Sequence, residues 1–268
     1  MPVDLEPPRA PSAYADDRVF AVLTLAGVDP GPNGPLADSL EKAGQPVIRI
    51  ELDDPIDLAG EAVRWEIATA IAGIVLGIDA FDQPNVEEAK ELTRKVLASA
   101  GARDGATAGA ATDAHDGAIR IAAHDAGSLA ELLKPTLKGA KPPGYIAVQA
   151  FIAPSAGVDN AITGVRTALA ATGCAVTAGY GPRFLHSTGQ LHKGGPATGI
   201  FLQLTSDHPV DRQIPGWPYT FGRLIDAQAN GDRAALRAHD RPVVHVHLGA
   251  NLEQDLATLE DAITRALA

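Results

Sequence analysis

The chain has 268 residues, and 46% of them are hydrophobic, which is enough for one large or two small globular domains with a core. Its 33 acidic residues outnumber its 22 basic ones, and the net charge of -11 repels a nucleic-acid backbone and an anionic membrane surface. We therefore expect no nucleic-acid and no membrane partner, and no apolar stretch reaches the roughly 18 residues that a bilayer-spanning helix needs.

The first part of the chain predicts an arm followed by alternating strands and helices. Residues 1–17 contain four prolines and no apolar periodicity, so we expect an N-terminal arm. The runs VFAVLTL and PVIRIEL predict strands on either side of a helix over GPLADSLEKAG, which makes a β-α-β unit. A long helix is predicted over residues 57–77. Its second half is almost entirely apolar, so we expect it to be buried on every side and packed under the first sheet.

The remainder predicts a second lobe that follows a linker. The stretch SAGARDGATAGAATDAHD is almost entirely Ala, Gly, Thr and Asp and cannot bury enough surface to order itself strongly, so residues 99–140 are expected to form a linker with short elements. Beyond it, YIAVQAFI, CAVTAGYG, GIFLQLT and RPVVHVHL predict strands that alternate with helices. The pattern predicts α/β architecture with mainly parallel sheets in two lobes, residues 18–98 and 141–268.

The single cysteine, Cys174, opens a predicted strand with no obvious base beside it, so we assign it no nucleophilic role. One cysteine excludes an internal disulfide, and the N-terminal segment is acidic and proline-rich where a signal peptide would be basic and then apolar. Both features favour a cytoplasmic protein.

A turn at FDQPNVEEAK, residues 81–90, interrupts the predicted helices. Pro84 disfavours helical torsions in the residue before it, so the preceding element ends there. Asn85 is a good N-cap, and Glu88 three residues later can complete a capping box. Lys90 then lies near the positive end of the new helix dipole, where a cation is unfavourable. On this pattern Lys90 either points into water, screened by neighbouring glutamates, or is placed there for a function.

The segment GIVLGIDAFDQPNVEEAK, from Gly73 to Lys90, resembles the phosphoglucose isomerase signature, in which Phe-Asp-Gln-x-Gly-Val-Glu-x-x-Lys follows a glycine and apolar residues. The one departure is Asn85, where the common form has Gly, and both residues tolerate unusual torsions at a turn. The resemblance implies that Lys90 is catalytic, contacting the sugar near its ring oxygen and reacting carbons. It also implies that Gln83 helps to hold the substrate.

Longer blocks resemble the C-terminal portion of the bifunctional transaldolase–phosphoglucose isomerase fusion family: DDRVFAVLTL, GQPVIRIELDDPIDLAGEAVRWEIATAIAG and GYGPRFLHSTGQLHKGGPATGIFLQLT. The resemblance implies that residues 18–98 are the C-terminal part of a sugar-isomerase (SIS-like) domain. It also implies interconversion of glucose 6-phosphate and fructose 6-phosphate, without cofactor or metal. That reaction needs a carboxylate base and a phosphate loop. Because the resemblance places both upstream, we expect this chain to be inactive alone and to need the missing N-terminal isomerase or transaldolase part.

A second candidate site is the polar stretch HSTGQLHKGG, which is predicted as a loop between two strands. Its hydroxyls, glycine N–H groups and lysine could cradle a phosphate, and the alternative is a glycine-rich connection folded against its own domain. The first interpretation supports a different function, a non-catalytic phosphosugar-binding or interaction module. The candidate residues are His186, Ser187, Thr188, Gly189, His192 and Lys193.

His245 and His247 share one face of a predicted strand in VVHVHL. Two histidines with this spacing could begin a metal site, but no third ligand with suitable spacing is evident. We therefore expect partly buried structural histidines.

Overall fold

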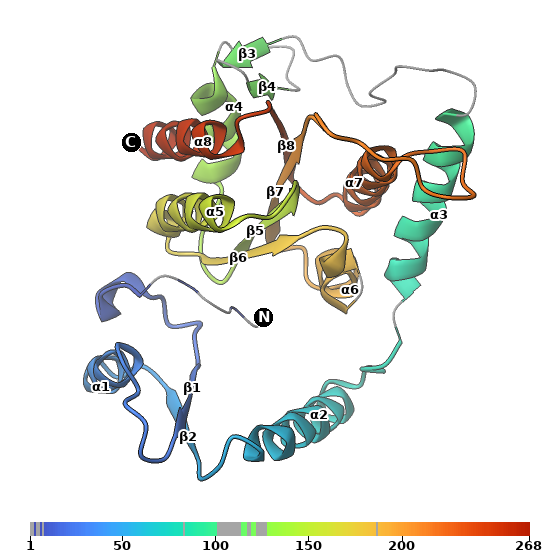
Figure 1. Ribbon diagram of the computed structural model, residues 1–268. Helices are drawn as coiled ribbons and strands as arrows, with labels where there is room; N and C mark the ends of the chain where they lie inside the picture. Colours follow the sequence, from blue (N-terminus) through green and yellow to red (C-terminus); the bar gives the residue numbers. More distant parts are fainter. Residues whose placement is uncertain are drawn as a thin grey trace. The chain divides into compact units, whose positions relative to one another are not determined.

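The computed structural model describes residues 3, 6, 8–82, 84–100, 114–116, 119–121, 128–185 and 187–268. The chain divides into two compact units: an N-terminal unit, Pro8–Asp82, and a C-terminal unit formed by Gln83–Ala268 together with Met1–Pro7. Each unit combines helices with a sheet (Figure 1). The predicted α/β architecture with two lobes is therefore confirmed.

The N-terminal unit contains the predicted β-α-β arrangement. Its two strands are parallel and pair from Phe20↔Val47 to Leu25↔Leu52. The preceding arm packs on this strand pair, since the ring of Tyr14 lies edge-on to Phe20 at 5.0 Å between centroids. In chain order the elements are η1 (Pro11–Ala13), β1 (Phe20–Leu25), α1 (Asn33–Lys42), β2 (Val47–Leu52) and α2 (Asp57–Leu76).

Helix α2 contradicts the prediction that its second half is buried on every side. Only Glu61 and Gly73 of this helix are buried, whereas Ile74 and Val75 are 80% and 79% exposed. The prediction was wrong because apolar composition buries a helix only where a surface exists to pack on, and a two-stranded sheet is too narrow for a 20-residue helix. No helix among the described residues is long and apolar enough to cross a bilayer.

The C-terminal unit is built on one six-stranded sheet with the order β3-β4-β8-β7-β5-β6. Strands β6, β5, β7 and β8 are parallel, which confirms the mainly parallel arrangement, and β4 adds an antiparallel edge to β8. The elements are α3 (Pro84–Ala100), β3 (Ala114–Asp116), β4 (Ile119–Ile121), α4 (Leu129–Lys138), β5 (Tyr145–Phe151), α5 (Ala156–Leu169), η2 (Ala170–Thr172), β6 (Ala175–Tyr180), η3 (Arg183–Leu185), α6 (Ser187–Gly194), β7 (Gly199–Ser206), α7 (Phe221–Ala238), β8 (Val243–Leu248) and α8 (Leu252–Leu267).

The boundary between the units differs from the predicted one at residues 98 and 99. It lies between Asp82 and Gln83, inside the FDQPNVEEAK turn, because α3 packs along α7 and so belongs to the C-terminal unit. The described strands and helix of the predicted linker are also part of that unit, since β4 pairs with β8 and α4 packs on α8. The stretch 101–113, whose composition suggested the boundary, lies outside the described residues.

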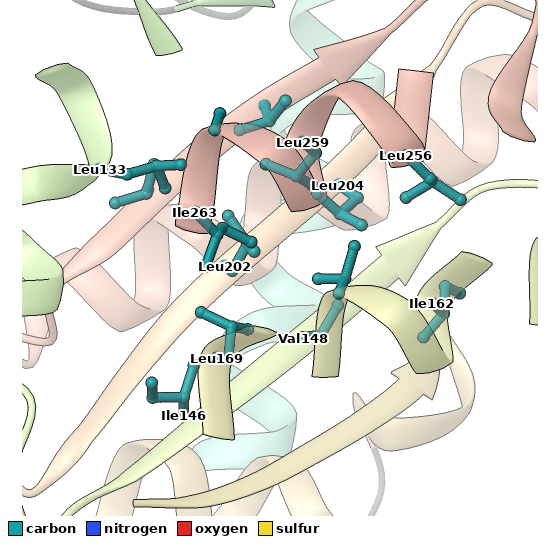
Figure 2. Packing of buried hydrophobic residues seen from close by; sticks show 14 of the residues in the cluster. Leu133, Ile146, Val148, Ile162, Leu169, Leu202, Leu204, Leu256, Leu259 and Ile263 are labelled. Carbon is teal, nitrogen blue, oxygen red and sulfur yellow. The ribbon is translucent and has the colours of Figure 1, made fainter. Parts of the chain in front are cut away.

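The two faces of this sheet have different chemistry. Helices α4, α5 and α8 cover one face, and α3, α6 and α7 lie on the other (Figure 1). The first face is apolar, and Figure 2 shows Leu259 and Ile263 of α8 beside Leu204 and Leu202 of β7. Side chains alternate along a strand, so the second face receives the intervening residues, among them Gln149 and Gln203, which are direct neighbours across β5 and β7. The buried polar side chains of the two central strands, Gln149 and Gln203, therefore face α6 and α7.

Candidate functional site

The signature segment lies at the start of α3. This helix begins at Pro84, close to the predicted start at Val86. Gln83, the expected substrate-holding residue, lies outside the described residues. Lys90 is exposed, and its Nζ lies 2.5 Å from Glu87 Oε1. Lys90 hydrogen-bonds to Glu87 and thereby lowers the pKa of that carboxyl. In this state Lys90 points into water and is screened by a glutamate, which is the first of the two placements that the sequence allows.

Asn85 joins the start of α3 to α6. Its backbone N–H donates to Gln190 Oε1 at 3.0 Å, and the Gln190 side-chain amide donates back to Asn85 Oδ1 at 2.9 Å. Glu88, one turn further along α3, accepts a hydrogen bond from His239 Nε2 at 2.8 Å, beyond the end of α7. This contact lowers the pKa of Glu88. The structure therefore brings together the two predicted site segments, the signature and HSTGQLHKGG, although through residues that were not predicted to be functional.

The prediction that HSTGQLHKGG is a loop is wrong, because Ser187–Gly194 forms helix α6. Its serine, threonine and glycines favour turns over helices. Distant contacts override that preference, since the Arg241 guanidinium donates to the carbonyls of His192, Lys193 and Gly195 at 3.2, 2.7 and 2.6 Å. These are carbonyls at the helix C-terminus, where an arginine satisfies acceptors that have no partner within the helix.

The predicted phosphate-binding residues do not form one exposed site. Lys193 and His192 are buried, and Gly189 is also buried, whereas Thr188 is exposed. His186 lies outside the described residues, as does the side chain of Ser187. The glycine-rich phosphate cradle is therefore replaced by a helix with one face in the core.

Lys193 forms an ion pair with Asp232 of α7 inside the unit. The Nζ and Oδ1 atoms lie 2.6 Å apart, and neither side chain has exposed surface. Burial raises the pKa of Asp232, and the nearby Lys193 ammonium opposes that shift. Such a pair holds α6 against α7 because leaving either charge unpaired in the interior is costly.

His192 lies beside this pair in an aromatic setting. Its ring contacts Phe201 at 4.9 Å between centroids, and the side-chain amide of Gln149 lies 3.3 Å from its Nδ1. Burial and the nearby Lys193 charge lower the pKa of His192 to about 3. The imidazole is therefore neutral at pH 7, and its Nδ1 accepts the amide N–H. Gln149 was missed from the sequence, although a lone glutamine in the apolar strand YIAVQAF signals a buried polar contact.

Four side chains form a hydrogen-bonded chain at the carboxyl ends of β7 and β8. Thr205 Oγ1 lies 2.9 Å from His245 Nε2 and 2.9 Å from His247 Nδ1, and His247 Nε2 lies 3.1 Å from Asp207 Oδ1. If His247 Nε2–H donates to the carboxylate, its Nδ1 accepts the threonine proton, and the hydroxyl accepts from His245. The predicted placement of both histidines on one face is confirmed, and Thr205 is their shared partner.

The buried histidines predict acid sensitivity of the C-terminal unit. The folded unit holds His192 and His245 with pKa values of about 3, against an unfolded value near 6.5. Between these values the unfolded chain binds more protons, so stability falls as pH drops from about 6.5 towards 3. The slope is at most about 1.4 kcal/mol per pH unit for each histidine. Urea unfolding at several pH values measures this slope, and hydrogen exchange in β5 and β7 at the same pH values provides a second measure.

The matched variant for this prediction is His245→Gln, which keeps an amide donor near Thr205 but cannot titrate. It is expected to lower the slope by the contribution of one titrating group, at most about 1.4 kcal/mol per pH unit. An unchanged slope would show that His245 titrates normally in the folded unit.

No family model and no curated protein matches the chain. Among solved structures, the crystal structure of a hypothetical protein, TT0462, from Thermus thermophilus is similar over 91% of this chain, with 14% identity and a TM-score of 0.44. The match covers 55% of that protein, so this chain spans about half of its length. A similarity at this TM-score supports no conclusion about fold or function.

Proposed function

We propose that this chain is part of a cytoplasmic glucose-6-phosphate isomerase and that another polypeptide segment completes its sugar-isomerase lobe. The proposal rests on the resemblance of Gly73–Lys90 to the isomerase signature. In such an enzyme Gln83 and Lys90 would face the sugar phosphate. The reaction moves a proton between two neighbouring carbons through an enediol, with no cofactor or metal.

The observation that carries the need for a second segment is the narrowness of the N-terminal unit. Parallel sheets are normally covered on both faces, and two strands are fewer than the roughly four to six that are usual in a sheet. Here only two parallel strands are present, with a hollow of about 210 Å³ between β1 and α1, and the apolar end of α2 is exposed. Additional strands and a helix layer from the same kind of lobe would cover these surfaces.

The proposal also places the required base outside this chain. Three carboxylates, Glu87, Glu88 and Glu91, lie beside Lys90 on the described part of the signature helix, and the first two have partners. Glu87 accepts from Lys90, and Glu88 accepts from His239. A base that abstracts a carbon-bound proton must be free to reach the substrate. Glu87 and Glu88 are therefore poor candidates, and the proposal follows the resemblance in assigning the base to the completing segment.

The alternative of a phosphosugar-binding module built on HSTGQLHKGG has little support. Its lysine is buried against Asp232, and the segment is a helix whose C-terminus is held by Arg241. A mobile, exposed phosphate cradle would leave these groups available to a ligand.

A coupled assay for glucose 6-phosphate tests the proposal. The purified chain alone is expected to convert fructose 6-phosphate at background rate only, and co-expression with an N-terminal isomerase half of the fusion family is expected to give turnover. Strong turnover by the chain alone would show that the catalytic set is misplaced. If the co-purified assembly does not convert fructose 6-phosphate to glucose 6-phosphate, the isomerase assignment is overturned. This holds whether or not the assembly binds fructose 6-phosphate.

A further inference from the structure

The polar contacts of α3 with the rest of the C-terminal unit include a cluster at its first turn, which contains Asn85 and Glu88. We propose that α6 and the end of α7 act as a brace that sets the position and rotation of α3, and that Gln190 and Asn85 are positioning residues for Lys90. The part of this inference that concerns Lys90 rests on the proposed isomerase function, whereas the brace itself does not.

The amide pair fixes the helix start in both directions. The Gln190 amide accepts from the Asn85 backbone N–H and donates to the Asn85 side chain, so both ends of one side-chain amide are used. A reciprocal pair of this kind holds the two groups in one relative orientation. The Asn85 N–H is also one of the helix N-terminal donors that have no partner within the helix. Gln190 therefore caps α3 from another element.

A second contact prevents rotation of α3 about its axis. Glu88 accepts from His239 at 2.8 Å and lies three residues after Asn85, on the same helix face. The Asn85 side-chain amide lies 3.4 Å from the same Glu88 oxygen, which ties the two contacts together. Lys90 is two residues beyond Glu88. Two anchored points one turn apart therefore determine the direction in which Lys90 leaves the helix.

The brace is itself rigid because α6 is fixed in the core. Lys193, three residues after Gln190, is held by Asp232, and Arg241 holds the last carbonyls of the helix. Gln190 thus projects from a helix that cannot shift without exposing a buried charge pair. This arrangement gives the HSTGQLHKGG segment a positioning role in place of the phosphate-binding one.

Gly194 shows how closely the amide pair is packed. A Cβ at this position would lie 2.5 Å from Asn85 Oδ1 and 2.5 Å from Gln190 Nε2. Both side-chain atoms must move to admit a methyl group, so we expect Gly194→Ala to disturb the hydrogen bonds of the pair. Alanine also favours the helical state over glycine. The substitution therefore disturbs the brace without weakening α6 itself.

Hydrogen exchange of the chain alone tests the brace without any enzyme activity. We expect Gly194→Ala and Gln190→Leu each to speed exchange in residues 84–92 by about tenfold or more, because the capping contacts are lost. Exchange in β5 and β7 should stay unchanged. The control is Lys95→Ala, which removes an exposed side chain from the same helix. Unchanged exchange in residues 84–92 for both brace variants would overturn the proposal, whether or not the isomerase assignment holds.

Turnover by the completed enzyme tests the link to Lys90. Both brace variants are expected to lower kcat by about 10- to 100-fold, because small misplacements of a reacting group carry losses of this size. KM should change little, since phosphate binding lies elsewhere. Faster exchange with normal kcat would refute the positioning role and leave the isomerase proposal standing. Absence of turnover in the unsubstituted assembly would overturn the isomerase proposal and with it the positioning of Lys90, while the exchange result would still decide the brace.

Discussion

Replacing Asp232 with alanine is expected to destabilise the C-terminal unit by about 3–5 kcal/mol, because it leaves the Lys193 ammonium buried without its partner. A loss of this size is a large share of the stability of an ordinary domain. Lys193 lies in α6. If its ammonium moves towards solvent, we expect α6, which contacts Asn85 through Gln190, to shift with it. Urea unfolding measures the loss in free energy of unfolding, and hydrogen exchange in β7 reports the same loss within the core.

Two further variants separate burial from charge in this prediction. Asp261→Ala removes an exposed carboxylate from α8 and is expected to change stability by less than about 0.5 kcal/mol. The double variant Lys193→Met, Asp232→Leu removes both charges and is expected to recover most of the loss, because replacing a whole buried pair by apolar residues is often neutral. If Asp232→Ala were as stable as the unsubstituted chain, the buried pair would not hold α6.

The second large effect is expected at Lys90 in the completed enzyme. Lys90→Ala should lower turnover by about 10²- to 10⁴-fold, which is typical for loss of a positioned proton-transfer group. The fold should stay intact, because the lysine is exposed and its pair with Glu87 lies in water, where such pairs contribute little. Lys90→Arg should rescue little, because a guanidinium stays protonated and cannot pass a proton.

The coupled isomerase assay and a thermal melt of the same samples check this result. Lys95→Ala is the matched control, since it removes another exposed lysine from the same helix and should leave turnover unchanged. Near-normal turnover of Lys90→Ala would mean that the signature holds the helix in place and has no catalytic part.

The strands were predictable because each depends mostly on its own residues. VFAVLTL and GIFLQLT contain apolar, strand-favouring residues bounded by turn residues, and both form parallel strands where expected. Helix α6 was not predictable from its own residues, because its helical state depends on Arg241, about 46 to 49 positions away in the sequence. Likewise, a local apolar pattern in α2 says nothing about whether a partner surface exists.

The features of the site that depend on local sequence were predicted, and those that depend on distant contacts were not. The turn and the helix start were visible in Pro84 and Asn85. The partner of Lys193 was not, since Asp232 is one of several polar residues in α7 and only the packing selects it. Gln149 and Gln203 gave a usable signal, because each is a single amide in an apolar strand, but their pairing across β5 and β7 required the strand order.

The position of α8 in the apolar core has a consequence for how the protein is made. Leu256, Leu259 and Ile263 have no exposed surface, and they close the face formed by β5 and β7. Strand β4 pairs with β8, which lies more than 120 residues later in the sequence, so this pairing also cannot form until β8 has been synthesised. While the ribosome is still synthesising α8, the sheet face stays open to solvent and to other nascent chains. The core of the C-terminal unit therefore closes only after α8 has emerged from the ribosome, and a change that removes or displaces α8 acts on the core itself.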